Sequence, residues 1–407
     1  MPDVTQTNTI ELVEETRQAL QSVRGRLIEL YGAVGADPEA PQEVARRYGI
    51  NRNLTWKLAR VISAPGPFAS LNHLPGQQGL ELAIERFEQA GAPDGAVAEA
   101  RSAVRHFAEV VQSHTGDREH LELTLESMGL LEREATAVSG RELAFRGNSS
   151  VWGAQAKTRV TTAFVAPSSL GPDKLDSVVV AGLVGFRRLR PSVQWLLFRQ
   201  QVVDDRGAKL GQEMEPIDDN CGDVPQILTD LCSPNMPDLT VLDVPGGREL
   251  MLPGGQVGNR AAFDCYYGYL VRGVPAYRSP GNELGSYGVA VTLPVENIVV
   301  DVVFHQSLTI DRTIEAMLYG FPHGGPDNPS AQSDRNRLPM NDRPVELAGA
   351  PPALATPLVP AITRAADRVY TRMGWNPSEF RGLRLRVPYA PMGSQVVMHW
   401  PLPAKPG

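Results

Sequence analysis

Cysteine is scarce in this chain of 407 residues, which contains only Cys221, Cys232 and Cys265. None of the three belongs to a CxxC pair and their number is odd, so neither a zinc-finger motif nor a disulfide framework is indicated. Proteins that do without disulfides are typical of the cytoplasm. We therefore expect three structural thiols in a cytoplasmic protein.

Long hydrophobic runs are also missing. The longest, from 178 to 186, is about half of what a membrane-spanning helix requires. The first residues are acidic and polar, so we expect no signal peptide and no membrane partner. The net charge of −7 excludes a general polyanion binder, because contact with nucleic acid would then need a local concentration of basic residues.

The signature motifs of several enzyme classes are absent from the sequence. It contains no HExxH, no P-loop, no GxGxxG after an expected strand and no GxSxG. Acidic residues between Asp204 and Asp223 lack the spacing of an EF-hand loop, and the seven histidines are scattered. The sequence thus indicates no metal, no cofactor and no catalytic residue, and it favours a protein that is not an enzyme.

One pair of side chains could take part in acid–base catalysis or in metal binding. Asp301 and His305 lie four residues apart on an expected strand, so they share one face of it, and Asp311 follows. Strand ends often carry such residues without any reaction. Whether they form a site stays open at this point.

Two patterns divide the chain near Leu130. Before it, apolar residues recur at spacings of three and four, which predicts amphipathic helices. The expected helices are 9–34, 41–48, 53–62, 79–89, 95–113 and 118–128. After Leu130, segments rich in Val, Leu and aromatic residues are bounded by Gly, Pro and Asp, which predicts strands. The expected strands are 158–166, 177–186, 193–203, 239–244, 288–293, 297–305, 383–387 and 395–400.

Two helices, 309–319 and 360–373, are expected among these strands. Strands grouped with few helices favour an α+β fold over a regular βαβ alternation. We predict an all-helical N-terminal region with a helix-turn-helix, followed by a mixed domain with a mainly antiparallel sheet and a few helices. The predicted segments are a DNA-binding domain (1–64), a helical connector or dimerisation region (65–130) and an α+β domain of unknown task (131–407).

The segment 41–62 has the local features of two short helices at a fixed crossing angle. Ala45 is small where the first helix approaches the second, and Gly49 stands at the turn, where a positive φ is easiest for glycine. Asn51 or Asn53 can cap the second helix. The apolar residues that would hold the two helices together are Val44, Tyr48, Ile50, Leu54, Leu58 and Val61.

This segment resembles the helix-turn-helix of bacterial transcriptional regulators. The resemblance implies that the second helix enters the major groove of DNA, with its N-terminal residues at the base edges and its flanks at the phosphates. The residues from Gln42 to Ile62 carry a local net charge of +4, as phosphate contacts require. The candidate DNA-binding residues are Arg46, Arg47, Arg52, Asn53, Thr55, Trp56, Lys57 and Arg60.

Three functional hypotheses follow. The leading one is a DNA-binding transcriptional regulator that binds double-stranded DNA as a homodimer or higher homo-oligomer, with a ligand-sensing or oligomerisation domain and a small-molecule effector. The second is a structural, self-assembling protein without sequence-specific DNA binding. The third is an enzyme whose active site is assembled from dispersed residues.

Overall fold

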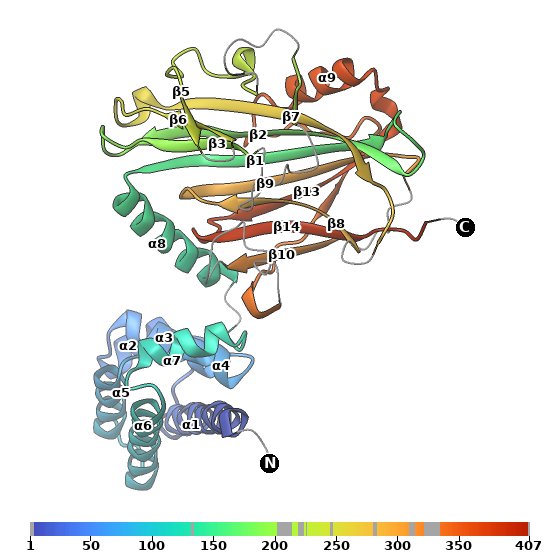
Figure 1. The fold of residues 1–407 in the computed structure, drawn as a ribbon. Helices are drawn as coiled ribbons and strands as arrows, with labels where there is room; N and C mark the ends of the chain where they lie inside the picture. Colours follow the sequence, from blue (N-terminus) through green and yellow to red (C-terminus); the bar gives the residue numbers. More distant parts are fainter. Residues whose placement is uncertain are drawn as a thin grey trace. The chain divides into compact units, whose positions relative to one another are not determined.

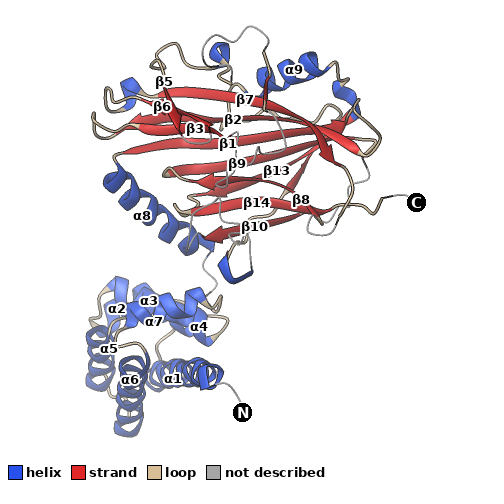
Figure 2. Ribbon diagram, in the orientation of Figure 1, coloured by secondary structure: helices blue, strands red, loops and turns tan. Residues whose placement is uncertain are grey.

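The computed structural model describes residues 4–131, 134–201, 214–218, 224, 226–244, 247–279, 283–308, 314–320 and 334–405. It separates into two compact units, Met1–Ala137 and Val138–Gly407. The first is helical and the second is built mainly of strands (Figure 1, Figure 2), which confirms the α+β fold class. The predictions that concern Cys221, Asp311 and Asp204 lie outside the described residues.

The helical unit contains every helix predicted before residue 130, together with a short helix, α4, that was not predicted. Its elements are α1 (Val4–Val34), α2 (Pro41–Tyr48), α3 (Arg52–Ser63), α4 (Pro67–Leu71), α5 (Gln77–Gln89), α6 (Asp94–His114) and α7 (Arg118–Ser127).

These helices share one hydrophobic core. Phe87 of α5 is fully buried, and its ring meets Tyr31 of α1 and Tyr48 of α2 edge-on, with centroids 5.1 and 5.3 Å apart. Leu27 of α1 and Val104 of α6 belong to the same cluster. The two segments predicted separately, 1–64 and 65–130, therefore pack as a single unit.

The second unit is built around three sheets. Its strands are β1 (Ala154–Pro167), β2 (Lys174–Arg188), β3 (Trp195–Gln201), β4 (Glu215–Pro216), β5 (Thr240–Val244), β6 (Gly247–Leu252), β7 (Phe263–Pro275), β8 (Leu284–Val291), β9 (Val295–His305), β10 (Glu315–Gly320), β11 (Arg337–Leu338), β12 (Val345–Leu347), β13 (Phe380–Pro388) and β14 (Ser394–Pro401). Two helices accompany them, α8 (Glu134–Trp152) and α9 (Ile362–Met373).

The largest sheet has seven strands in the order β12-β13-β9-β1-β2-β7-β4. The pair β1–β9 is parallel, and the other strand pairs of this sheet are antiparallel. A four-stranded sheet has the order β11-β10-β14-β8, and a three-stranded sheet has the order β3-β6-β5.

Both faces of the seven-stranded sheet are buried. The side chains of β9 illustrate this, because they alternate between two hydrophobic cores. Val300 and Phe304 belong to the core shared with β8, β10 and β14, whereas Val299 and Val303 belong to the core under α9. This division follows from the alternation of side chains along a strand. The seven-stranded sheet is thus the middle layer, between the four-stranded sheet and α9.

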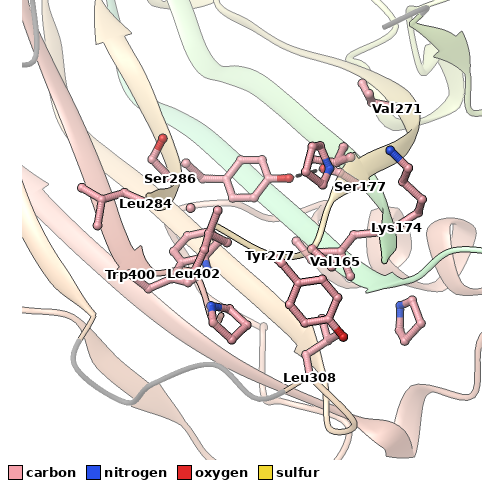
Figure 3. Close-up of a pocket in the computed structure, with 18 of the residues that line it drawn as sticks. Val165, Lys174, Ser177, Val271, Tyr277, Leu284, Ser286, Leu308, Trp400 and Leu402 are labelled. Carbon is pink, nitrogen blue, oxygen red and sulfur yellow. Dashed lines mark hydrogen bonds between the residues drawn. The ribbon is translucent and has the colours of Figure 1, made fainter. Parts of the chain in front are cut away.

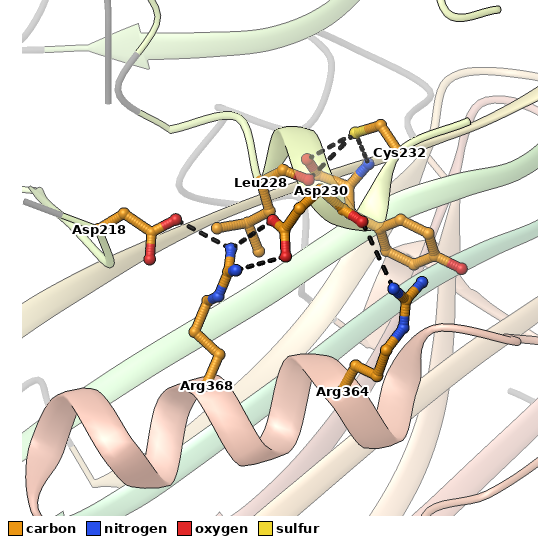
Figure 4. A network of polar contacts seen from close by, with 7 residues as sticks. Asp218, Leu228, Asp230, Cys232, Arg364 and Arg368 are labelled. Atoms are coloured by element: carbon orange, nitrogen blue, oxygen red, sulfur yellow. Dashed lines mark hydrogen bonds and ion pairs between the residues drawn. The ribbon is translucent and has the colours of Figure 1, made fainter. Parts of the chain in front are cut away.

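Ion pairs attach α9 to the segment that precedes β5 (Figure 4). The Arg368 guanidinium donates hydrogen bonds to Asp218 at 2.9 Å and to Asp230 at 2.7 Å. Arg364 donates to the carbonyl oxygen of Asp230. Cys232 lies beside this network with its sulfur accepting a hydrogen bond from the Tyr266 amide at 3.2 Å.

Two predictions about secondary structure need correction. The predicted helix 309–319 is wrong over its described part, because Glu315–Gly320 forms β10 and buries Ala316 and Leu318 on one face. Helix α8 was not predicted, because Gly147 and the serines that follow it are typical of a turn. Among the described residues, no helix combines the length and the apolar character that crossing a membrane requires.

Candidate functional site

The predicted helix-turn-helix segment has the expected backbone. Gly49 ends α2 in the left-handed conformation, with φ 63° and ψ 30°, and the Ile50 amide donates to the Ala45 carbonyl. The side chain of Asn51 accepts a hydrogen bond from the Asn53 amide at 2.8 Å and caps α3. The local sequence signals therefore predicted this pair of helices correctly.

The predicted contact residues of this segment do not all lie on its surface. Thr55 is fully buried and its hydroxyl donates to the Arg52 carbonyl at 3.0 Å. Its selection as a DNA contact was wrong, because a fully buried side chain cannot reach a DNA surface. The exposed candidates are Arg46, Arg47, Arg52, Asn53, Trp56, Lys57 and Arg60.

Part of this basic surface already packs against aromatic rings of its own unit. The Arg60 guanidinium lies 5.2 Å from the centre of the Trp56 ring, and Trp56 meets His73 edge-on at 5.8 Å. Arg47 lies 5.2 Å from the Tyr48 ring. These contacts give Arg60, Trp56 and Arg47 a role in the packing of the helical unit itself.

Asp301 and His305 share a strand face but have different partners. The Asp301 carboxylate is buried and pairs with Arg384. His305 shares hydrogen bonds with Ser307 at 2.7 Å and with Glu379 at 3.3 Å. The structure therefore shows a buried ion pair and a separate strand-end histidine. The described residues contain no group of three or more His, Cys, Asp or Glu side chains arranged to hold a metal ion.

A cavity with a volume of about 720 Å³ lies in the second unit. Its walls come from β1, β2 and β7 of the seven-stranded sheet and from β8 and β14 of the four-stranded sheet. Segments 276–277, 307–308 and 402–404, together with Pro172 and Met214, complete it. Binding sites for small molecules typically measure roughly 300–1,000 Å³ and are mostly apolar with a few polar groups, and this cavity has that character.

Aromatic rings form one wall of the cavity. Tyr287 of β8 and Trp400 of β14 stack with centroids 5.8 Å apart and an angle of 24° between their planes. Phe304 supports Trp400 edge-on from behind at 5.1 Å. Gly285 leaves room for this arrangement, because a Cβ atom at that position would lie 2.3 Å from the Trp400 ring.

Polar groups are few and lie at defined places in the cavity. The hydroxyl groups of Ser177 and Tyr287 share a short hydrogen bond across the space between β2 and β8. Burial raises the pKa of Tyr287 and of Tyr269, so both phenols are neutral at physiological pH. Figure 3 shows Lys174, Ser177 and Val271 on one side, opposite Leu284 and Trp400.

Sequence reasoning missed this cavity because its lining has no local pattern. The residues that face each other across it, such as Ser177 and Tyr287, are far apart along the chain. Three tyrosines, Tyr266, Tyr267 and Tyr269, lie close together in the sequence, and Tyr269 lines this cavity. This cluster was the signal available in the sequence, but a packed strand is the commoner explanation for such a cluster.

Comparison with known proteins assigns no family. No protein-family model matches the chain, and no curated protein matches it. Solved structures that it resembles include a proposed protease from Parabacteroides distasonis (TM-score 0.26, 10% identity, covering 62% of this chain and 41% of that one). An M1 zinc metallopeptidase from Deinococcus radiodurans matches with a TM-score of 0.23 and 9% identity, covering 60% of this chain and 42% of that one.

These matches are weak and partial. This chain spans about two fifths of the length of the solved structures it resembles, and TM-scores this low transfer neither a fold family nor an activity. The HExxH motif of many zinc peptidases is absent from the sequence.

The comparisons correct the leading functional hypothesis. The solved structures named above are described as peptidases, and none is described as a DNA-binding regulator. We withdraw the hypothesis that this chain is a DNA-binding transcriptional regulator, because no compared protein supports it and Thr55, one of its proposed DNA contacts, is buried. The bounds of α2 and α3 were predicted to within one residue, and the turn between them was correctly predicted.

Proposed function

We propose that the second unit binds a mainly apolar small molecule in the cavity between β2, β7, β8 and β14. The observation that carries this proposal is the cavity itself, with its volume of about 720 Å³ and its wall of stacked aromatic rings. Burial of apolar surface there contributes roughly 25 cal/mol per Å² before the costs of association are subtracted.

The walls of the cavity are held by regular structure. Ser177 and Tyr269 lie on β2 and β7, which pair with each other, and Tyr287 lies on β8, which pairs with β14. The aromatic wall is supported from behind by Phe304, which is buried in the core. A ligand therefore meets a site that is formed before it arrives, and little conformational entropy is lost on binding.

A cavity-filling substitution tests the proposal. We expect Ala276→Trp to weaken binding of a neutral apolar probe by at least about tenfold, which corresponds to about 1.4 kcal/mol, because the indole occupies space that Ala276 leaves free. The probe is N-phenyl naphthylamine, whose fluorescence rises in an apolar environment. The measurement is a fluorescence titration of the full-length chain.

The matched control is Val345→Trp, which adds the same side chain to β12, where Val345 is 64% exposed and does not line the cavity. It should bind the probe as the unchanged protein does. Equal binding by all three proteins would place the probe outside the cavity and would reject the proposal. Circular dichroism spectra of the variants check that both remain folded.

A further inference from the structure

We propose that the ligand of this cavity carries an anionic head group, which pairs with the ammonium group of Lys174. This inference rests on the proposed function and specifies its ligand as an amphipathic organic acid. Among the described residues that line the cavity, Lys174 has the one charged side chain. The positive charge therefore lies on one side of the cavity.

The backbone of Lys174 is firmly placed. Lys174 begins β2, where it pairs with Pro275 of β7, and its amide donates to the Gly171 carbonyl. Its side chain is half-buried. In Figure 3 it stands beside Ser177 and Val271, across the cavity from Leu284, Trp400 and Leu402. A ligand head group at Lys174 would thus leave the apolar body against the aromatic wall.

The acidic side chains near Lys174 pair with other cations. Asp173 pairs with Lys405 at 3.4 Å. Asp176 and Glu215 both pair with Arg272, at 3.1 and 3.3 Å. Within the described part of the chain, no carboxylate forms an ion pair with Lys174. Its positive charge is therefore available to a ligand.

Hydroxyl groups next to Lys174 suit the same head group. Ser177 stands on the same strand as Lys174, and its hydroxyl and that of Tyr287 share one hydrogen bond, which uses one proton of the two. The proton that remains can be donated to an anion. A half-buried ammonium together with a hydroxyl donor favours a carboxylate, sulfonate or phosphate over a neutral polar group, because bonds between charged partners are the stronger ones.

Two fluorescent probes with the same aromatic body separate charge from apolar burial. Anilinonaphthalene sulfonate carries an anionic group, and N-phenyl naphthylamine lacks it. We expect Lys174→Met to lower the preference for the anionic probe over the neutral one by about tenfold, as the loss of one charge-assisted contact implies. Lys174→Arg should keep most of this preference, because it keeps the charge.

The control is Lys157→Met, which removes the same charge from an exposed side chain of β1 that does not line the cavity. It should leave the preference unchanged. Lys174→Met with an unchanged preference would overturn the anionic head group and leave the apolar site standing. An equal loss in both lysine variants would overturn it as well, since net charge alone would then explain the effect. Failure of the unchanged protein to bind either probe would overturn both proposals.

Discussion

Replacing Arg384 by methionine is expected to lower the free energy of unfolding of the second unit by about 3–5 kcal/mol. The Arg384 guanidinium donates to both oxygens of Asp301, from Nε at 2.7 Å and from Nη2 at 2.8 Å. Asp301 is fully buried in the middle of the seven-stranded sheet. Without Arg384 its carboxylate is an unpaired charge in a core, and this accounts for the large effect.

Urea unfolding followed by tryptophan fluorescence measures this loss. Lys405→Met is the control, because the ion pair between Lys405 and Asp173 is exposed and such pairs contribute at most about 1 kcal/mol. Replacing both partners, as Arg384→Met with Asp301→Leu, should recover much of the lost stability, since no unpaired charge remains. A loss for Arg384→Met no larger than that of the control would contradict the importance of the buried pair.

The same variant should show a characteristic dependence on pH. Burial raises the pKa of Asp301 above its ordinary value, and Arg384 opposes this rise. Removing Arg384 therefore raises the pKa further. Because the pKa is then higher in the folded than in the unfolded chain, stability falls as pH rises between the two values. The difference between variant and unchanged protein should be largest at neutral pH and should shrink as the pH falls, as urea unfolding at each pH will show.

Phe87→Ala is expected to destabilise the helical unit by about 3–5 kcal/mol, the usual cost of removing a buried aromatic side chain. Phe87 is fully buried and contacts Tyr31 and Tyr48 from two other helices. The cavity left behind opens the contacts among α1, α2 and α5. Because these helices share one core, the whole unit should unfold in one transition at lower urea.

Trp56 reports on this unit, because it is the one tryptophan among residues 1–137. Its environment should change together with the helical signal in circular dichroism. Leu82→Ala is the control on the same helix, where Leu82 is 40% exposed, and it should change stability by less than about 0.5 kcal/mol. If Phe87→Ala left Trp56 in its native environment while other helices unfolded, the single core would be refuted.

Local rules explain what the sequence could predict. The turn between α2 and α3 was predicted from Gly49 and Asn51, since a left-handed turn and a helix cap are decided by neighbouring residues. The division into a helical and a strand-rich part was predicted from the spacing at which apolar residues recur along the chain. The same spacing predicted that Arg52 and Lys57 lie on the exposed face of α3, as they do.

Longer-range packing explains what the sequence did not predict. Thr55 was assigned to the surface because it lies near the N-terminus of the expected recognition helix, yet its side chain is fully buried. The residues 315–320 suit a helix by composition, and their pairing with β14 makes them a strand. The cavity forms only where the fold brings β2, β7, β8 and β14 together. These strands are far apart in the sequence, so no short segment predicts the cavity.

The most direct test of the central claim is a crystal structure of the full-length chain with N-phenyl naphthylamine bound. The account predicts the probe between β2 and β8, with its rings against the stacked pair Tyr287 and Trp400. A probe found elsewhere, with this cavity empty at saturating concentration, would contradict the proposed binding function.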